Sequence, residues 1–236
     1  MPNHIHTIPV LDALREPGDC AFCVMYTKLE ESAINFIMGP AYMEEDVRTE
    51  TNRLGFCGPH MKAMYAGQNR LGFALMLHTY MRRLNNDISA IIKDKQPSPL
   101  FGKDANGPLA KIYGHIANVG ESCYVCNQVE NTFARYLDTF LHLWGKGGED
   151  AALITSQKSY CIPHFTQLVG LAAKLGRSKR EKFTEEIMLP QLKYMQELEG
   201  DLEWFTLKFD YRYTNEPWKN AKDALPRAIG LLGEGE

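Results

Sequence analysis

Apolar residues recur at intervals of three and four over most of the chain, which is the spacing of one face of an α-helix. Turn signals, Gly39-Pro40 and the glycine-rich residues 145–148, close two of these runs. Pro190 is expected to kink the last run. No segment alternates convincingly between apolar and polar residues as a half-buried strand would, so we expect an all-α fold. The predicted helices are residues 23–38, 60–93, 126–144, 164–176 and 180–209.

An internal repeat emerges when the cysteines are placed on this helical pattern. A Cys-x2-Cys pair recurs 103 residues later, and a Cys-x2-His pair recurs 104 residues later, so that all six cysteines of the chain take part. We therefore predict two pseudo-repeated helical units, residues 1–95 and residues 109–236 with a C-terminal tail. Residues 96–108, rich in Pro, Gly and Asp, are the expected linker. The four pairs are Cys20/Cys23, Cys57/His60, Cys123/Cys126 and Cys161/His164.

The residue types in each predicted unit indicate a bound metal ion. Zinc takes four ligands in a tetrahedron, and thiolates and imidazoles are ligands that it prefers. Four protein ligands leave no position open for water or substrate, so we expect structural sites. Each unit should be clamped by one Cys3His site, and the chain should hold two Zn²⁺ ions. The set expected in the first unit is Cys20, Cys23, Cys57 and His60, and in the second unit Cys123, Cys126, Cys161 and His164.

The residues next to these motifs favour helix starts. Pro59 and Pro163 each precede a motif histidine, and proline suits the first turn of a helix because its missing N–H is not needed there. Asp19 and Ser122 are candidate N-caps before the first cysteine of each Cys-x2-Cys pair. The positive end of a helix dipole stabilises a thiolate, and this would assist metal binding.

Two other kinds of chemistry fit part of the same pattern. Three thiolates and one imidazole could hold an iron–sulfur cluster in place of zinc. Thiol–disulfide exchange at Cys20/Cys23 or Cys123/Cys126 is the other alternative, but the βαβ context typical of thioredoxin-like motifs is absent.

Charge and the N-terminal segment exclude several partners. A net charge of -3 offers no basic surface for nucleic acid or for an anionic membrane. The N-terminus lacks the basic start and long apolar run of a secretory signal, and no run of about 18 apolar residues exists that could span a membrane. We expect a cytoplasmic protein, in which cysteines stay reduced and available to metal.

Polar residues outside the motifs provide a second candidate site. Glu44, Arg48 and Asn52 lie between two predicted helices of the first unit, and Arg70 follows on the next one. Together with Asp210 they could line a polar pocket, although a solvated helix face is the simpler interpretation. The aromatic and charged tail at residues 209–218 is expected to pack and hold the C-terminal part in place.

Several short motifs make the chain resemble a prokaryotic family of unknown function with duplicated Cys-x2-Cys and Cys-x-Pro-His elements. Some members of that family carry an ABC-transporter substrate-binding label. The resemblance covers nearly the whole chain, and it implies that the eight metal-site residues occupy the family's motif positions. It rests on Thr7-Ile-Pro-Val10, Gly39-Pro-Ala41, Asp46-Val-Arg48, Gly55-Phe-Cys57, Asn69-Arg-Leu-Gly72, Leu75-Met-Leu-His-Thr79, Cys123-Tyr-Val-Cys126, Cys161-Ile-Pro-His164 and Phe209-Asp-Tyr-Arg-Tyr213.

The sequence therefore favours a cytoplasmic metal-binding protein that serves as a binding or scaffold module for a protein or a small molecule. The alternative is an enzyme or redox carrier with an iron–sulfur or thiolate centre, using a polar pocket around Glu44, Arg48, Asn52 and Arg70. No residue is assigned a catalytic role, and the closed ligand sets favour a protein that is not an enzyme.

Overall fold

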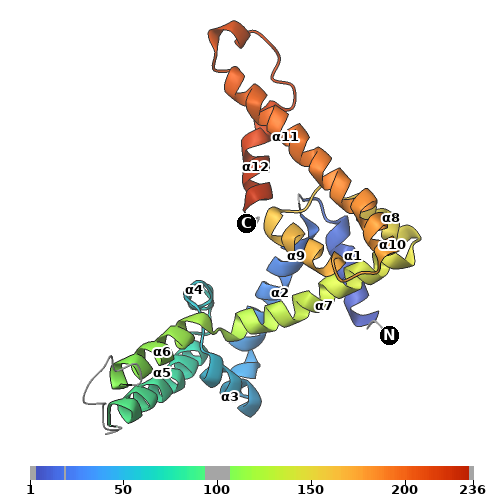
Figure 1. Ribbon diagram of the computed structural model, residues 1–236. Coiled ribbons are helices and arrows are strands. Elements are labelled where there is room, and N and C mark those ends of the chain that lie inside the picture. Colours follow the sequence, from blue (N-terminus) through green and yellow to red (C-terminus); the bar gives the residue numbers. More distant parts are fainter. Residues whose placement is uncertain (1–3, 19, 94–106, 234–236) are drawn as a thin grey trace. The chain divides into compact units, whose positions relative to one another are not determined.

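The computed structural model describes residues 4–18, 20–93 and 107–233, which form helices and no strand, so the predicted all-α class is confirmed for them. Figure 1 labels these helices along the chain. Short 3-10 turns at His4–His6, Pro40–Met43, Tyr211–Tyr213 and Ala221–Asp223 connect some of them. The helices are α1 (Thr7–Arg15), α2 (Ala21–Met38), α3 (Glu45–Leu54), α4 (Gly58–Ala66), α5 (Arg70–Lys93), α6 (Pro108–Glu121), α7 (Tyr124–Lys146), α8 (Glu149–Thr155), α9 (Ile162–Ala172), α10 (Arg177–Phe183), α11 (Leu189–Leu207) and α12 (Ala224–Leu232).

The chain forms two compact units whose bounds differ from those of the expected repeats. Unit 1 takes in residues 1–28 and 133–236, and unit 2 takes in residues 29–132. Both boundaries fall inside long helices, α2 and α7, so unit 2 is inserted between the two chain segments of unit 1. The expected linker, residues 96–108, lies almost entirely outside the described residues. The internal repeat stays a prediction from the sequence.

Large aromatic side chains fill the core of unit 1. Phe22 on α2 lies with its ring centroid 4.9 Å from that of Phe140 on α7 and 5.1 Å from that of Tyr160. Trp144, at the end of α7, meets Phe183 edge-to-face at 5.5 Å. Burying a side chain of this size contributes about 1.5–3 kcal/mol to stability, and aromatic pairs add about 0.5–1.5 kcal/mol.

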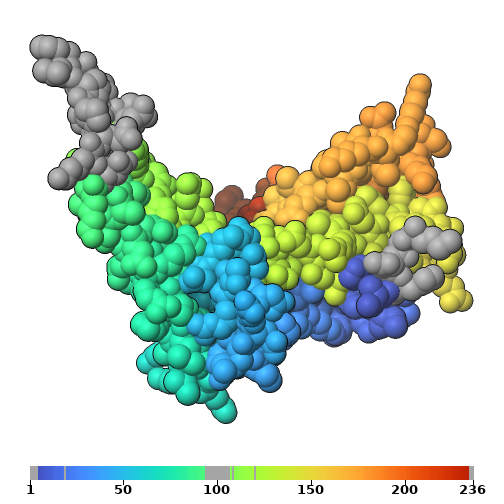
Figure 2. Space-filling view, turned by 90° about the horizontal axis from the view of Figure 1, so that it is seen from below, coloured from blue at the N-terminus to red at the C-terminus, as the bar shows by residue number. Residues whose placement is uncertain are grey.

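Unit 2 is built around the pair α3 and α5, which lie side by side in Figure 2, in blue and blue-green. Gly55 ends α3 with φ +66°, and its backbone lies so close to the Tyr80 ring on α5 that a Cβ would come within 2.3 Å of a ring atom. Only glycine meets both conditions. Arg83 on α5 donates to the carbonyl of Arg53 at 2.8 Å, which satisfies a free carbonyl at the end of α3.

The tail after α11 is held by one buried lysine. Lys208 is 8% exposed, and its ammonium donates to the backbone carbonyls of Tyr213, Thr214 and Glu216. The Trp204 indole N–H also donates to the carbonyl of Pro217 at 3.0 Å. Helix α12 then packs on α11 through Leu198, Ala224, Ala228 and Leu231. Pro190, the expected kink, lies in the first turn of α11, directly after a π-helical turn at Thr184–Met188.

Candidate metal centres

The eight candidate ligands gather into two groups of four, but in a grouping that the sequence did not predict. In each group the ligand atoms all lie within 4.8 Å of one another. Each Cys-x2-Cys pair is joined by the Cys-x2-His pair of the other predicted repeat, so the expected sets are wrong. Centre A, in unit 1, comprises Cys20, Cys23, Cys161 and His164; centre B, in unit 2, comprises Cys57, His60, Cys123 and Cys126.

Helix length explains why the pairs are exchanged. Helix α2 has 18 residues, so its ends lie about 27 Å apart, and Cys23 lies at its first turn. Cys57 follows the far end of α2 in the chain, whereas Cys20 and Cys23 lie at its start. Helix α7 has 23 residues and is about 34 Å long; Cys126 lies in its first turn, and the chain leads on to Cys161 only after the other end of the helix. The predicted repeat indicates which residues correspond in sequence, but it does not predict which of them lie together in the structure.

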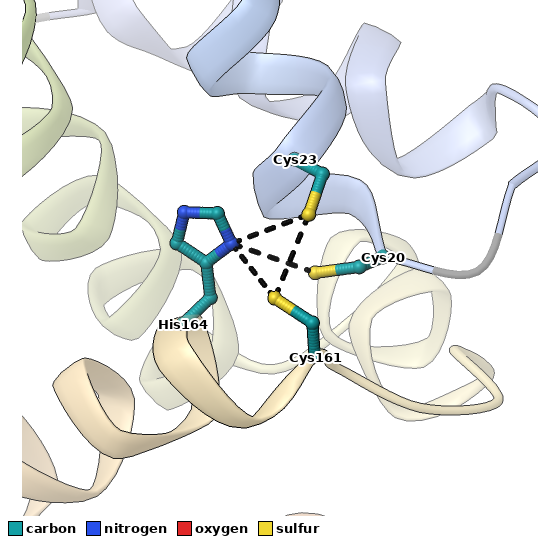
Figure 3. Close-up of side chains that lie close together, drawn as sticks. All are labelled: Cys20, Cys23, Cys161 and His164. Carbon is teal, nitrogen blue, oxygen red and sulfur yellow. Dashed lines mark hydrogen bonds between the residues drawn. The ribbon is translucent and has the colours of Figure 1, made fainter. Parts of the chain in front are cut away.

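Centre A has the spacing of a single-ion site (Figure 3). The Nδ1 atom of His164 lies 3.1 Å from the sulfur of Cys161, 3.4 Å from that of Cys23 and 3.9 Å from that of Cys20. The sulfurs of Cys23 and Cys161 are 3.5 Å apart. All four side chains point toward one common point in the close-up view. Cys20 and Cys161 are buried, and Cys23 is partly exposed.

Centre B repeats this arrangement with other residues. The Nδ1 atom of His60 lies 3.0 Å from the sulfur of Cys57, 3.3 Å from that of Cys123 and 3.4 Å from that of Cys126. The sulfurs of Cys57 and Cys126 are 3.8 Å apart. In this centre two thiols, those of Cys57 and Cys126, are partly exposed.

These separations, 3.0–3.9 Å, lie close to the edge lengths of a coordination tetrahedron. With metal–ligand bonds of about 2.0–2.3 Å, neighbouring ligand atoms of a tetrahedron lie about 3.3–3.8 Å apart. Disulfides require sulfur atoms about 2.05 Å apart, and all six cysteines are free thiols. Both groups could therefore hold one metal ion each, and the protein supplies all four ligands.

Two helix N-termini converge on each centre. Cys20 directly precedes α2 and Cys161 is the N-cap of α9 in centre A, whereas Cys123 directly precedes α7 and Cys57 is the N-cap of α4 in centre B. Prolines 59 and 163 lie in the first turns of α4 and α9, as the sequence predicts. The partial positive charges of these helix ends stabilise thiolates.

The expected N-caps are not part of this arrangement. Ser122 ends α6, and its hydroxyl donates to the carbonyls of Leu54 and Val119, so the predicted N-cap role is wrong. Asp19 lies outside the described residues.

The candidate ligands differ in how readily they give up their protons. Hydrogen bonds from Cys161 and Cys23 hold the pKa of Cys20 well below its usual range, and the same contacts raise the pKa of Cys161. Burial lowers the pKa of His164, but hydrogen bonds to Cys20 and Cys23 outweigh it and raise the pKa to about 9. In centre B, burial raises the pKa of Cys126. A metal ion has to displace these protons.

Backbone contacts fix the approach to each Cys-x-Pro-His element. Gln191 on α11, 2% exposed, accepts a hydrogen bond from the N–H of Tyr160 and donates one to its carbonyl. In unit 2 the N–H of Tyr124 donates to the carbonyl of Gly55 at 2.9 Å. Sequence reasoning missed Gln191, because a single glutamine in a helix carries no signal of its long-range partner.

The two histidines have different surroundings. The ring centroid of His164 lies 5.1 Å from that of Phe133, and Phe22 and Tyr26 also contact this ring. The Nε2 atom of His60 instead lies 2.7 Å from a carboxylate oxygen of Glu30.

The predicted polar pocket is only partly assembled. Arg48 and Asn52 line a cavity of about 310 Å³ in unit 2, together with Glu45, Thr49, Thr79 and Arg82. Glu44 borders a neighbouring hollow. Arg70 lies over the Tyr65 ring at 4.4 Å, and Asp210 belongs to unit 1, where it pairs with Arg212.

Comparison with known proteins assigns the chain to a family. The model of a family of unknown function, DUF6062, matches residues 1–235, which include all eight ligands. The chain belongs to this family. No curated protein and no solved structure matches it.

The α/β lobes that a substrate-binding label would imply are missing from the described part of this DUF6062 member, which has no strand. None of its described helices combines the length and apolar character needed to cross a membrane.

Proposed function

We propose that this DUF6062 chain binds two zinc ions, one in each unit, and that the ions are structural cross-links of a helical binding or scaffold module. The observation that carries the proposal is the convergence of three sulfurs and one imidazole Nδ1 in each centre. Such a set satisfies tetrahedral zinc completely and leaves no position for a substrate.

Ligand spacing favours a single ion over an iron–sulfur cluster. A cluster with several irons binds its protein ligands at different metal atoms, which spreads the ligands more widely than one ion does. Here the ligand atoms all lie within 4.8 Å of one another. Three thiolates and one imidazole are also a common structural zinc set.

The positions of the centres along the chain support a structural role. Unit 1 consists of two chain segments, residues 1–28 and residues 133–236. Centre A joins them, because Cys20 and Cys23 belong to the N-terminal segment and Cys161 and His164 to the C-terminal segment. Centre B joins the start of α4, inside unit 2, to the start of α7, near the C-terminal end of that unit. Zinc at such a site can contribute about 10–16 kcal/mol at neutral pH, which is comparable to the stability of a whole domain.

Metal analysis of anaerobically purified protein tests this proposal. We expect about two zinc ions per chain by elemental analysis. A brown sample with absorption near 400 nm would assign iron–sulfur centres instead. A metal-free protein with six titratable thiols and an intact fold would refute the proposal.

The thiolate ligands bear on the location of the protein, and its net charge bears on its partner. Thiolate ligands persist in a reducing compartment, so we place the protein in the cytoplasm. The partner that we propose is a protein or a small molecule and neither nucleic acid nor membrane, because the chain carries a net charge of -3.

A second candidate function is the binding of a small molecule in the cavity beside Arg48. Asn52 Oδ1 is buried and has no hydrogen-bond partner among the described residues, and Asn52 lines the cavity with Arg48 and Arg82. A molecule with an anionic group and an N–H or O–H donor would satisfy all three side chains. Thermal shifts with a panel of amino acids and organic acids test this candidate. A shift that Arg48→Ala abolishes supports it, and no shift with any of them refutes it.

A further inference from the structure

We infer that Glu30 is a positioning residue for His60, and that its carboxylate makes centre B bind metal more tightly than it would with an uncharged neighbour. This inference rests on the proposed function, because it concerns metal affinity at one of the two proposed sites.

The geometry of the imidazole carries the first step. In His60, Nδ1 faces the three sulfurs of centre B at 3.0–3.4 Å, and Nε2 faces an oxygen of Glu30 at 2.7 Å. Binding a metal through the Nδ1 lone pair requires the tautomer with its proton on Nε2. That N–H donates to the carboxylate, so Glu30 selects the tautomer that binds metal and fixes the orientation of the ring.

The carboxylate lies on the wrong side of the ring to be a ligand itself. The two nitrogens flank Cε1 of the imidazole and point in diverging directions, and Glu30 contacts the one that points away from the sulfurs. Its effect on a metal ion passes through the ring. A carboxylate that accepts the second N–H of a ligating histidine raises the basicity of the ligand and so strengthens the metal bond.

In centre A, the sequence position that corresponds to Glu30 holds an aromatic residue. The offset of 103 residues between the Cys-x2-Cys pairs places Phe133 opposite Glu30. In centre A the ring of Phe133 packs against that of His164, with centroids 5.1 Å apart. A phenyl ring can orient an imidazole by packing, but it cannot accept a charge-assisted hydrogen bond. The residues at these two corresponding positions therefore contact their histidines by different physical means.

The solvent exposure of Glu30 makes the inference testable without disturbing the core. Its side chain is 39% exposed, whereas that of His60 is 6% exposed. Glu30→Gln keeps the shape but removes the charge, and Glu30→Ala removes both. Glu31, the next residue on α2, is exposed, so Glu31→Gln is a control with the same change of charge.

The experiment is a chelator competition on the full-length, zinc-loaded chain under anaerobic conditions. We expect Glu30→Gln and Glu30→Ala to weaken one of the two zinc sites by about 10- to 100-fold, and Glu31→Gln to change neither. Glu30→Asp, which keeps a carboxylate, should recover part of the loss. Affinities of Glu30→Ala equal to those of Glu31→Gln would overturn the inference, and so would equal weakening of both sites.

Cadmium-113 NMR shows which centre responds. The cadmium-loaded chain should give two resonances, and Cys57→Ser identifies the one from centre B by altering or removing it. Glu30→Gln should shift that resonance and leave the other in place. A shift confined to the other resonance overturns the inference. Wild-type protein that binds no metal at all would instead contradict the proposed function, so the two failures are distinguishable.

Discussion

Gln191 holds the backbone of Tyr160 with two hydrogen bonds, from the Tyr160 N–H to its Oε1 at 2.8 Å and from its Nε2 to the Tyr160 carbonyl at 2.9 Å. Tyr160 directly precedes Cys161, so this amide from α11 fixes a ligand of centre A from a distance in sequence. All of these groups are buried, and water cannot replace the contact.

Gln191→Ala should therefore lower the free energy of unfolding by about 1–3 kcal/mol, because it leaves a buried N–H and a buried carbonyl without partners. Zinc at centre A should also become easier to remove with a chelator. Chemical denaturation and chelator competition measure the two effects. The matched control is Gln196→Ala, an exposed glutamine on the same helix. Equal stability of the two variants would contradict this role of Gln191.

Acid should weaken zinc binding at both centres, because protons compete for thiolates and imidazoles. At centre A the pKa of His164 in the metal-free chain is raised to about 9, so zinc has to displace a proton there throughout the neutral range. The apparent zinc affinity should rise with pH up to about 9. Competition titrations between pH 6 and 9 check this slope, and an affinity independent of pH would contradict it.

In the chain stripped of metal, the contribution of His164 to folding stability should fall as the pH rises, whereas zinc affinity should rise. A histidine whose pKa is raised on folding stabilises the fold below its unfolded pKa of about 6.5, and this contribution is lost as the pH rises through about 9. Denaturation midpoints of chelator-treated protein measure it. His164→Gln should flatten this part of the pH dependence, and an unchanged slope in that variant would assign the effect to other groups.

Lys208→Met should loosen the tail without affecting either metal centre. The buried ammonium donates to three carbonyls between Tyr213 and Glu216, and methionine leaves all three without that donor. We expect faster amide exchange and faster proteolysis across residues 209–218, with an unchanged zinc content. Lys193→Met is the control, since Lys193 is exposed and its ion pair with Glu197 contributes little. Equal protection in the two variants would contradict the role of Lys208.

Much of the fold and of the ligand inventory could be predicted from the sequence. The apolar spacing predicts helices where α2, α5, α7 and α11 lie, and the proline before each motif histidine predicts the starts of α4 and α9. These signals are local: the period of 3.6 residues and the geometry of a helix N-terminus both act within a few residues.

The pairing of the ligands could not be predicted in the same way. The pairing depends on the path of the chain after a long helix ends. The sequence pattern predicts the length of α2, but it does not predict the direction of the chain after α2. The roles of Gln191 and Glu30 could not be predicted from the sequence for a related reason. Each acts on a residue about thirty positions away, Tyr160 or His60, and neither belongs to a recurring motif.

The exchanged pairing is the central claim, and zinc stoichiometry in two double variants tests it most directly. Cys23→Ser with Cys57→Ser damages both centres if the pairing is exchanged, but only one site if each repeat binds its own ion. Cys23→Ser with Cys161→Ser has the opposite consequences. We predict about no tightly bound zinc in the first variant and about one zinc in the second, by elemental analysis after dialysis against a weak chelator. One zinc in the first variant and none in the second would contradict the structure.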